Sequence, residues 1–387
     1  MRHGNRGLSA YGTTIFEVMS GLAREHSAIN LGQGFPEGNG PDDVRTAAAR
    51  ALEDRPNQYP PMMGLPELRR AVAEHARRFY RLEVDGEREV LVTSGATEAL
   101  AACLLGLLDP GDEVVLFEPL YDSYLPIIER AGAIGRRVRL EPPSWRIDQR
   151  ALAAAFSPRT KLVLINTPMN PTGKVFTGDE LAAVADLAVA HDAFAVCDEV
   201  YEHLVFDGLR HIPLMSLPGM RERTARIGSA GKTFSLTGWK VGYITAAAEM
   251  LAPIARAHQF LTFTTPPNLQ AAAAYGLGKA DAYFTELAAG MQAGRDRLRA
   301  GLERLGFAVA DCQGTYFLTV DIRSVGFTGS DLEFCQTITR EARVAAIPYS
   351  AFYVDRPPEG QVRFAFCKPA ALLDEAIARL DAWLDRR

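Results

Sequence analysis

Short apolar runs alternate with segments of helical periodicity through the middle of the chain. Runs rich in Val, Ile, Leu and Phe that end at polar or glycine residues are typical of buried parallel strands. We expect such strands at residues 89–93, 114–117, 162–165, 194–197, 225–227 and 241–244. Among the helices between them, we expect one over 96–108 and one from a capping box at 177–180 to about residue 190. Strands that alternate with helices predict an α/β fold, with a mostly parallel sheet sandwiched between helices.

The two ends of the chain have a different pattern. An amphipathic helix is expected near 14–24, followed by a glycine-rich turn at 31–36. The C-terminal part predicts a second, smaller α/β unit with helices near 292–305, 331–343 and 372–384 and strands near 307–309, 316–320 and 362–366. No Ser/Gly linker separates the parts. We therefore expect a large domain over 45–285, packed closely against a small domain formed by 1–44 and 286–387.

Composition excludes several classes of protein. The 387 residues are 48% apolar, and 47 acidic against 42 basic residues leave a net charge of −5, without the basic patch of a nucleic-acid or membrane-surface protein. Apolar runs stay shorter than the roughly 18 residues of a membrane span. The five cysteines form no C-x-x-C pair, so we expect free thiols and no metal site. The first residues lack the apolar core of a signal peptide, which favours the cytoplasm.

A lysine among small and hydroxyl residues is the first candidate for chemistry. Residues 229–240 follow a predicted strand and read SAGKTFSLTGWK. Because burial or a second cation can remove the proton from an amine, Lys232 is a candidate for a Schiff base. Lys240 is a candidate for that second cation or for a phosphate contact. Two solvated lysines around a turn would give the same string.

Polar residues also follow two neighbouring predicted strands. Ligands of α/β sheets bind beyond the carboxyl ends of the strands. Asp198 could hold a positive charge there, and Tyr201 could reach the same ligand. Residues 166–173 form a turn after the predicted strand at 162–165. The prolines and the glycine of this turn could aim Asn170 at a ligand. Taken one by one, a helix-capping Asp, a surface Tyr and an ordinary turn explain these residues equally well.

Two further features could bind anions. Residues 94–97 (SGAT) lie between a strand and a helix, where free backbone N–H groups and the helix dipole favour a phosphate. They form neither a dinucleotide fingerprint nor a Walker sequence, so NAD and ATP gain no support. Arg363 lies within an apolar strand, where a guanidinium usually has a carboxylate partner. That partner could be structural or could belong to a substrate.

Together, and in this order from Leu31 to Lys368, these motifs resemble the fold-type I, class I/II aminotransferases that use pyridoxal 5′-phosphate (PLP). The resemblance implies that Lys232 forms the Schiff base with PLP and later moves a proton. Asp198 would keep the pyridine nitrogen protonated, which makes the ring an electron sink. Tyr201 and Asn170 would hydrogen-bond the O3′ oxygen of the ring.

The resemblance assigns the remaining contacts as well. Tyr121 would stack on the ring, and Arg363, with Asn170 and the backbone at Gly34, would hold the α-carboxylate of the substrate. The phosphate would be held by Ala96, Thr97, Ser229 and Lys240. Many relatives carry Arg at the position of Lys240, and lysine lacks the bidentate fork of arginine. Tyr59 would reach the phosphate of a partner subunit, which implies a homodimer with shared active sites.

Three strings narrow the resemblance to the kynurenine, glutamine and methionine aminotransferases: 30–36 (NLGQGFP), 238–242 (GWKVG) and 258–263 (HQFLTF). Residues 198–207 (DEVYEHLVFD) are also similar to bacterial chains assigned as N-succinyldiaminopimelate aminotransferases. The resemblance thus implies ping-pong transfer of an amino group from an L-amino acid to a 2-oxo acid.

The side chain of the donor is a separate question. No arginine for a distal carboxylate lies between Arg256 and Arg295, and the apolar residues Phe260, Phe263 and Pro266 with Thr264 suit methionine, an aromatic or a glutamine-like donor. Packing of these residues in the core, and N-succinyldiaminopimelate as the substrate, stay open. A PLP-dependent C–S lyase would share the cofactor residues. A PLP-binding regulator would need a DNA-binding domain, for which residues 1–30 leave little room.

Overall fold

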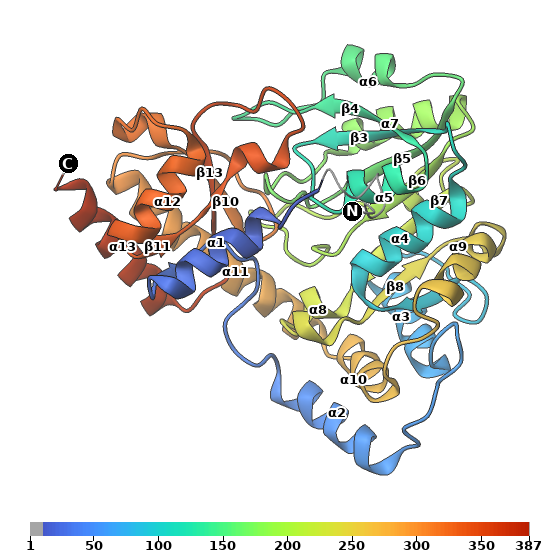
Figure 1. Ribbon diagram of the computed structural model, residues 1–387. Coiled ribbons are helices and arrows are strands. Elements are labelled where there is room, and N and C mark those ends of the chain that lie inside the picture. The colour runs from blue at the N-terminus through green and yellow to red at the C-terminus, as the bar shows by residue number, and fades with distance from the viewer. Residues whose placement is uncertain (1–10, 387) are drawn as a thin grey trace, which may run out of the picture.

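The computed structural model describes residues 11–386 and has a seven-stranded sheet at its centre (Figure 1). The strands follow the order β2-β8-β7-β6-β5-β3-β4. Their bounds are β2 (Val90–Thr93), β3 (Glu113–Glu118), β4 (Ile134–Arg139), β5 (Thr160–Asn166), β6 (Phe194–Asp198), β7 (Thr224–Ser229) and β8 (Gly242–Thr245). Strand β8 runs in the opposite direction to the other six strands of this sheet. The predicted mostly parallel sheet is confirmed.

Helices cover both faces of this sheet. Every residue of β2, β3, β7 and β8 is buried, as expected for strands covered on both faces. Helix α4 (Gly95–Leu107) packs over β6, β7 and β8 and against α9 (Ala248–Leu261). The remaining helices of this part of the chain are α2 (Asp42–Asp54), α3 (Pro66–Tyr80), α5 (Tyr124–Arg130), α6 (Gln149–Ala155), α7 (Gly178–Ala190), α8 (Ala230–Thr233) and α10 (Pro267–Leu277).

A second sheet brings the two ends of the chain together. Its four antiparallel strands have the order β12-β13-β10-β9, with bounds β9 (Ala308–Val309), β10 (Phe317–Asp321), β12 (Ile347–Pro348) and β13 (Gln361–Ala365). A parallel pair of β1 (Ile29–Asn30) and β11 (Val344–Ala345) joins the N-terminal segment to it. The helices here are α1 (Ile15–Glu25), α11 (Asp281–Arg304), α12 (Asp331–Glu341) and α13 (Ala370–Leu384). Figure 1 shows α1 beside α12.

The predicted domain boundaries fall inside two helices. The boundary at 44/45 lies within α2, which packs against α10, and the boundary at 285/286 lies within α11. The division into 45–285 and the two chain ends therefore stays a prediction. Residues 1–10 of the predicted small domain lie outside the described residues.

Two of the differences from the sequence expectations have a physical reason in the structure. Helix α11 begins at Asp281 rather than near residue 292, because its first turns also keep a helical pattern before the charged stretch. Strand β4 was not expected, since its arginines interrupt the apolar pattern. It is one of the two edge strands of the sheet, where charged residues are tolerated and prevent pairing with other chains.

Neither a membrane span nor a disulfide is found among residues 11–386. No helix there is long and apolar enough to cross a bilayer. The five cysteines are free and buried, as expected for free thiols.

The capping box at the start of α7 is confirmed and gives a stability prediction. The Thr177 hydroxyl accepts from the Glu180 N–H at 3.2 Å, and a Glu180 carboxylate oxygen accepts from the Thr177 N–H at 3.0 Å. Thr177→Ala should lower the free energy of unfolding by about 1 kcal/mol in urea titrations, because it removes a cap. Thr177→Ser keeps the hydroxyl and should lose much less. Equal losses for both variants would show that the cap does not stabilise α7.

Candidate active site

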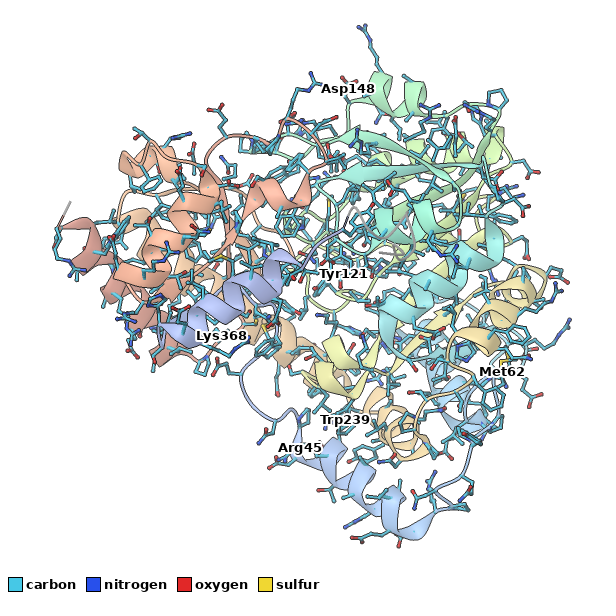
Figure 2. The ribbon with its side chains drawn as sticks, viewed as in Figure 1. Arg45, Met62, Tyr121, Asp148, Trp239 and Lys368 are labelled. Carbon is cyan, nitrogen blue, oxygen red and sulfur yellow. The ribbon has the colours of Figure 1, made fainter. Side chains whose placement is uncertain are left out.

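One cavity of about 290 Å³ lies at the carboxyl ends of β5, β6 and β7, and β13 from the second sheet completes it. Figure 2 shows Tyr121 in the region between α1 and α4. Apart from Tyr59, every site residue predicted from the sequence lines this cavity: Gly34, Ala96, Thr97, Tyr121, Asn170, Asp198, Tyr201, Ser229, Lys232, Lys240 and Arg363. Motifs far apart in the sequence thus meet in one place, as ligand sites of α/β sheets do.

Lys232 provides a partly buried amine. It lies in the short helix α8, directly after β7, and its Nζ donates to the Tyr316 hydroxyl at 2.7 Å. Burial lowers the pKa of Lys232 from 10.5 to about 8, Asp198 opposes this shift, and Arg363 and Lys240 add to it. The amine therefore loses its proton more easily than an exposed lysine does, which suits a nucleophile or a base.

Asp198 provides a buried carboxylate at the end of β6. Its Oδ2 accepts from the Tyr124 hydroxyl at 2.7 Å, and its backbone carbonyl accepts from the Asn166 side chain at 2.8 Å. Burial raises the pKa of Asp198 to about 6, against the hydrogen bond from Tyr124 and the charge of Lys232. A carboxylate in such a position is stabilised by a cationic ligand, because a positive partner offsets its loss of hydration.

Two tyrosine rings enclose the Lys232 amine. Tyr201 and Tyr316 meet edge to face with their centroids 5.1 Å apart, and Nζ lies 5.5 and 5.4 Å from the two rings. Tyr316 donates its hydroxyl to the Gly34 carbonyl at 2.5 Å. Gly34 must lack a side chain here, since a Cβ would lie 2.4 Å from the Phe317 ring. The amine is thereby connected to the segment that leads from β1 to α2.

The other end of the cavity is suited to an anion. Helix α4 begins at Gly95, and no side chain of Ser94 caps its first amides, those of Ala96 and Thr97 included. A Cβ at Gly95 would lie 3.5 Å from the Lys240 Nζ, so this ammonium lies beside the positive end of α4. Ser229 is the last residue of β7 and lines the same cavity. A cation, a helix start and a hydroxyl together favour a phosphate.

Arg363 extends from β13 into the cavity and has no carboxylate partner among the described residues. Its Nη1 donates to Asn170 Oδ1 at 2.8 Å and its Nη2 to the Gly32 carbonyl at 2.9 Å, while its buried Nε has no partner. The guanidinium lies 3.8 Å from the Phe317 ring centroid. Burial lowers the pKa of Arg363 to about 10, which leaves it charged at neutral pH. Of the two partners considered from the sequence, a substrate carboxylate fits this geometry.

The donor set of the cavity fits PLP. The phosphate of PLP needs the anion-binding end, its ring nitrogen needs a carboxylate such as Asp198, and its aldehyde needs an amine such as Lys232. All three lie in the same cavity.

Some predicted residues lie elsewhere, and some cavity residues were missed. Tyr59 is 84% exposed and contacts Phe263 edge to face, and Phe260 is also 84% exposed. The apolar residues Phe260 and Phe263 therefore line neither the cavity of their own chain nor its core, because they are exposed at the C-terminal end of α9. Residues that line the cavity without having been predicted include Phe16, Gln33, Tyr124, Asn166, Thr237 and Phe317. Tyr124 lies three residues after Tyr121, which could have indicated it, whereas no local signal marked Phe16.

Comparison with known proteins identifies the family of this chain. The family model "Aminotransferase class I and II" matches residues 26–380. A probable N-succinyldiaminopimelate aminotransferase of Mycobacterium tuberculosis is 47% identical over 98% of each chain. The methionine aminotransferase of Escherichia coli is 42% identical over 96% of each chain. The solved structure of N-succinyldiaminopimelate aminotransferase from M. tuberculosis superposes with a TM-score of 0.96, covering 98% of this chain and 100% of the other.

A match over nearly the whole chain and this close superposition agree with the chemistry of the cavity. This chain therefore belongs to the class I and II aminotransferases and is a PLP-dependent enzyme that acts on amino acids and 2-oxo acids.

Proposed function

We propose that this aminotransferase takes its amino group from an L-amino acid with an apolar side chain, such as methionine or an aromatic amino acid. The observation that carries the proposal is the set of cations in the cavity. Among the described residues only Lys232, Lys240 and Arg363 line it as cations. When Lys232 acts as the base, Lys240 binds the phosphate and Arg363 binds the α-carboxylate, no cation is left for a distal carboxylate. Phe16 and Phe317 surround Arg363 and suit an apolar side chain.

The proposed cofactor contacts follow from the positions of the side chains. PLP, when bound, supplies an electron sink that stabilises negative charge at the substrate α-carbon. Asp198 keeps the ring nitrogen protonated, because its buried negative charge favours a cation. Tyr201 and Asn170 would hold O3′, and Tyr121 would stack on the ring. Ala96, Thr97, Ser229 and Lys240 hold the phosphate.

The proposed proton transfer belongs to Lys232. With PLP bound, its Nζ would take the proton from the substrate α-carbon and would deliver it to the C4′ carbon of the cofactor, and the reverse path would serve the second substrate. The lowered pKa supports this role, since a base works best when its pKa is near the working pH. Tyr316 supports the amine through the 2.7 Å hydrogen bond. Arg363, Asn170 and the backbone at Gly34 orient the substrate carboxylate.

We also propose a homodimer in which Tyr59 reaches the phosphate of the partner subunit. The exposed rings of Tyr59, Phe260 and Phe263 support this, because large apolar side chains gathered on a surface favour an interface. Five free cysteines support the reducing cytoplasm as its compartment.

N-succinyldiaminopimelate is the second candidate substrate. The 47% identity with the M. tuberculosis enzyme favours it, and a backbone group or a partner residue could then meet the distal carboxylate.

A half-reaction screen tests the donor. The PLP-loaded protein is mixed with one amino acid at a time, and the loss of visible cofactor absorbance is followed. Methionine and phenylalanine should react at least about tenfold faster than glutamate or N-succinyldiaminopimelate, since one unmatched buried charge costs more than 1.4 kcal/mol. Faster reaction of N-succinyldiaminopimelate would overturn the proposal. Pyruvate formed from cystathionine without an oxo acid would instead indicate a C–S lyase.

Replacing the guanidinium fork tests the proposed carboxylate contact. Arg363→Lys keeps the charge but loses paired hydrogen bonds, so KM for both substrates should rise about 10- to 100-fold while kcat changes less. Steady-state kinetics measure this. The matched control is Arg295→Lys, which changes a buried fork that binds Asp207 away from the cavity and should leave KM unchanged. An unchanged KM for Arg363→Lys would make that arginine structural.

A further inference from the structure

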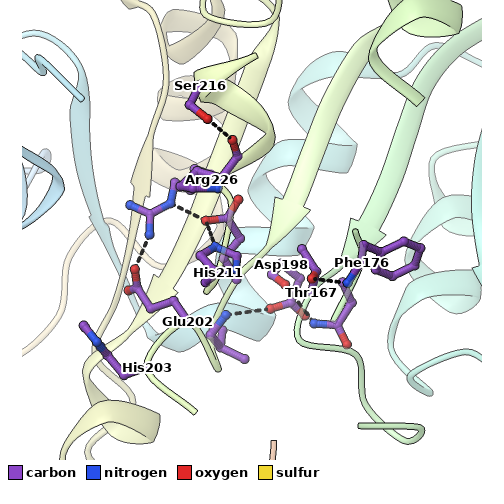
Figure 3. A network of polar contacts seen from close by, with 12 residues as sticks. Thr167, Phe176, Asp198, Glu202, His203, His211, Ser216 and Arg226 are labelled. Carbon is purple, nitrogen blue, oxygen red and sulfur yellow. Dashed lines mark hydrogen bonds and ion pairs between the residues drawn. The ribbon is translucent and has the colours of Figure 1, made fainter. Parts of the chain in front are cut away.

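A cluster of buried charges lies directly behind the cavity. We call Arg226, Glu199, Glu202 and His211 the Arg226 cluster. The Arg226 Nε donates to Glu199, its Nη2 donates to Glu202, and the His211 Nε2 lies 2.8 Å from the same Glu199 oxygen. Each of these residues is at most 9% exposed. Figure 3 shows Arg226 with Glu202 and His211 on one side of the view and Asp198 with Thr167 on the other.

The cluster holds the turn that carries two proposed cofactor contacts. After β6 the chain makes a tight turn, in which the Glu202 N–H donates to the Glu199 carbonyl at 2.9 Å. Asp198 and Tyr201, three residues apart, line the cavity. Glu199 and Glu202, also three residues apart, both bind Arg226. One turn therefore presents one pair of side chains to the cavity and the other pair to the arginine.

The strand that carries Arg226 also carries Ser229, a proposed phosphate contact, and leads directly into the helix that carries Lys232. Arg226 lies on β7 opposite Cys197 of β6, and the Glu199 N–H donates to the Ile227 carbonyl at 3.0 Å. Three residues further along β7 is Ser229, and Lys232 follows in α8. Arg226 is thus a direct side-chain link between the Asp198–Tyr201 turn and the segment that ends in Lys232.

Stability alone does not explain so many buried charges. Ion pairs lose much of their hydration on burial, and apolar residues of similar volume are often no less stable. The cluster is nevertheless well bonded: the guanidinium lies 4.4 Å from the Tyr80 ring centroid, and Tyr243 approaches Glu202 at 3.4 Å. Burial alone would raise the pKa of Glu202, but the charge of Arg226 holds it well below its usual value. Fixed charges with directional bonds specify one geometry, which apolar packing does less strictly.

We propose that Arg226 is a positioning residue that fixes the Asp198–Tyr201 turn at its distance from Lys232 and Ser229. The inference rests on the cofactor contacts proposed above for Asp198 and Tyr201. Its consequence is specific. Loosening the Arg226 cluster displaces the groups that act on the cofactor ring, while Arg363 keeps its own contacts with Asn170 and Gly32. A displacement of about 1 Å at such groups can reduce turnover about 100-fold.

Two variants of the Arg226 cluster test the proposal. Arg226→Lys keeps the charge and loses the fork. A triple variant, Arg226→Met with Glu199→Gln and Glu202→Gln, removes all three charges together, so that none stays buried without a partner. Both should lower kcat about 10- to 100-fold, leave KM within about threefold, and shift the pH midpoint of the visible absorbance of the bound cofactor. Thermal unfolding identifies which of the two variants is folded. One folded variant is sufficient to test the positioning role of Arg226.

Glu113→Gln is the matched control. Glu113 is a buried carboxylate on the same sheet that binds two arginines, Arg136 and Arg159, but it lies at the opposite end of its strand from the cavity. It should lower thermal stability without changing kcat or the midpoint. If the folded variants of the Arg226 cluster also lose thermal stability without a change in kcat or in the pH midpoint, Arg226 has only a structural role.

Asp198→Asn separates failure of this inference from failure of the proposed contacts. If Asp198→Asn leaves kcat and the midpoint unchanged, the proposed role of Asp198 is wrong. If Asp198→Asn changes kcat and the midpoint while the variants of the Arg226 cluster change neither quantity, only the positioning role of Arg226 is wrong.

Discussion

The partly buried Lys232 amine, which shares one cavity with the buried Asp198 carboxylate, is the constraint on which the rest of the site depends. Moving the pKa of Lys232 from 10.5 to about 8 corresponds to roughly 3 kcal/mol against the charged amine. Folding must supply that free energy through the packing around the cavity, which the central sheet and its helices provide. The amine that results can release its proton near neutral pH, and the opposing carboxylate remains available for a cationic partner.

The sheet topology explains why these groups meet. Strands β5, β6 and β7 are parallel, so the residues that follow them gather at one edge. The second sheet contributes Arg363 from β13, and the N-terminal segment contributes Gly34, which Tyr316 links to Lys232. The cavity therefore needs both ends of the chain. The pairing of β1 with β11 holds those ends together, and a shift of either end would move the carboxylate contact relative to the amine.

Local sequence signals predicted the parts of the site that lie directly after strands. Lys232, Asp198 and Asn170 follow apolar runs, and a strand end indicates position as well as chemistry. Tyr316 and Arg226 could not be found in this way, since their roles depend on which strands become neighbours. Strand β4 was missed because an edge strand tolerates arginines. The aromatic residues after position 259 were placed in the cavity for their apolarity alone, and the structure puts Phe260 on the surface.

Burial in the folded chain makes Lys232 an unusually weak base. NMR titration of the PLP-free protein labelled with ¹⁵N-lysine tests this directly, with the Lys232 signal assigned by its absence in Lys232→Arg. We predict a midpoint near pH 8, with the amine charged below it and neutral above it. A midpoint near 10.5, the value of an ordinary lysine, would contradict the claim that the cavity prepares this amine for proton transfer.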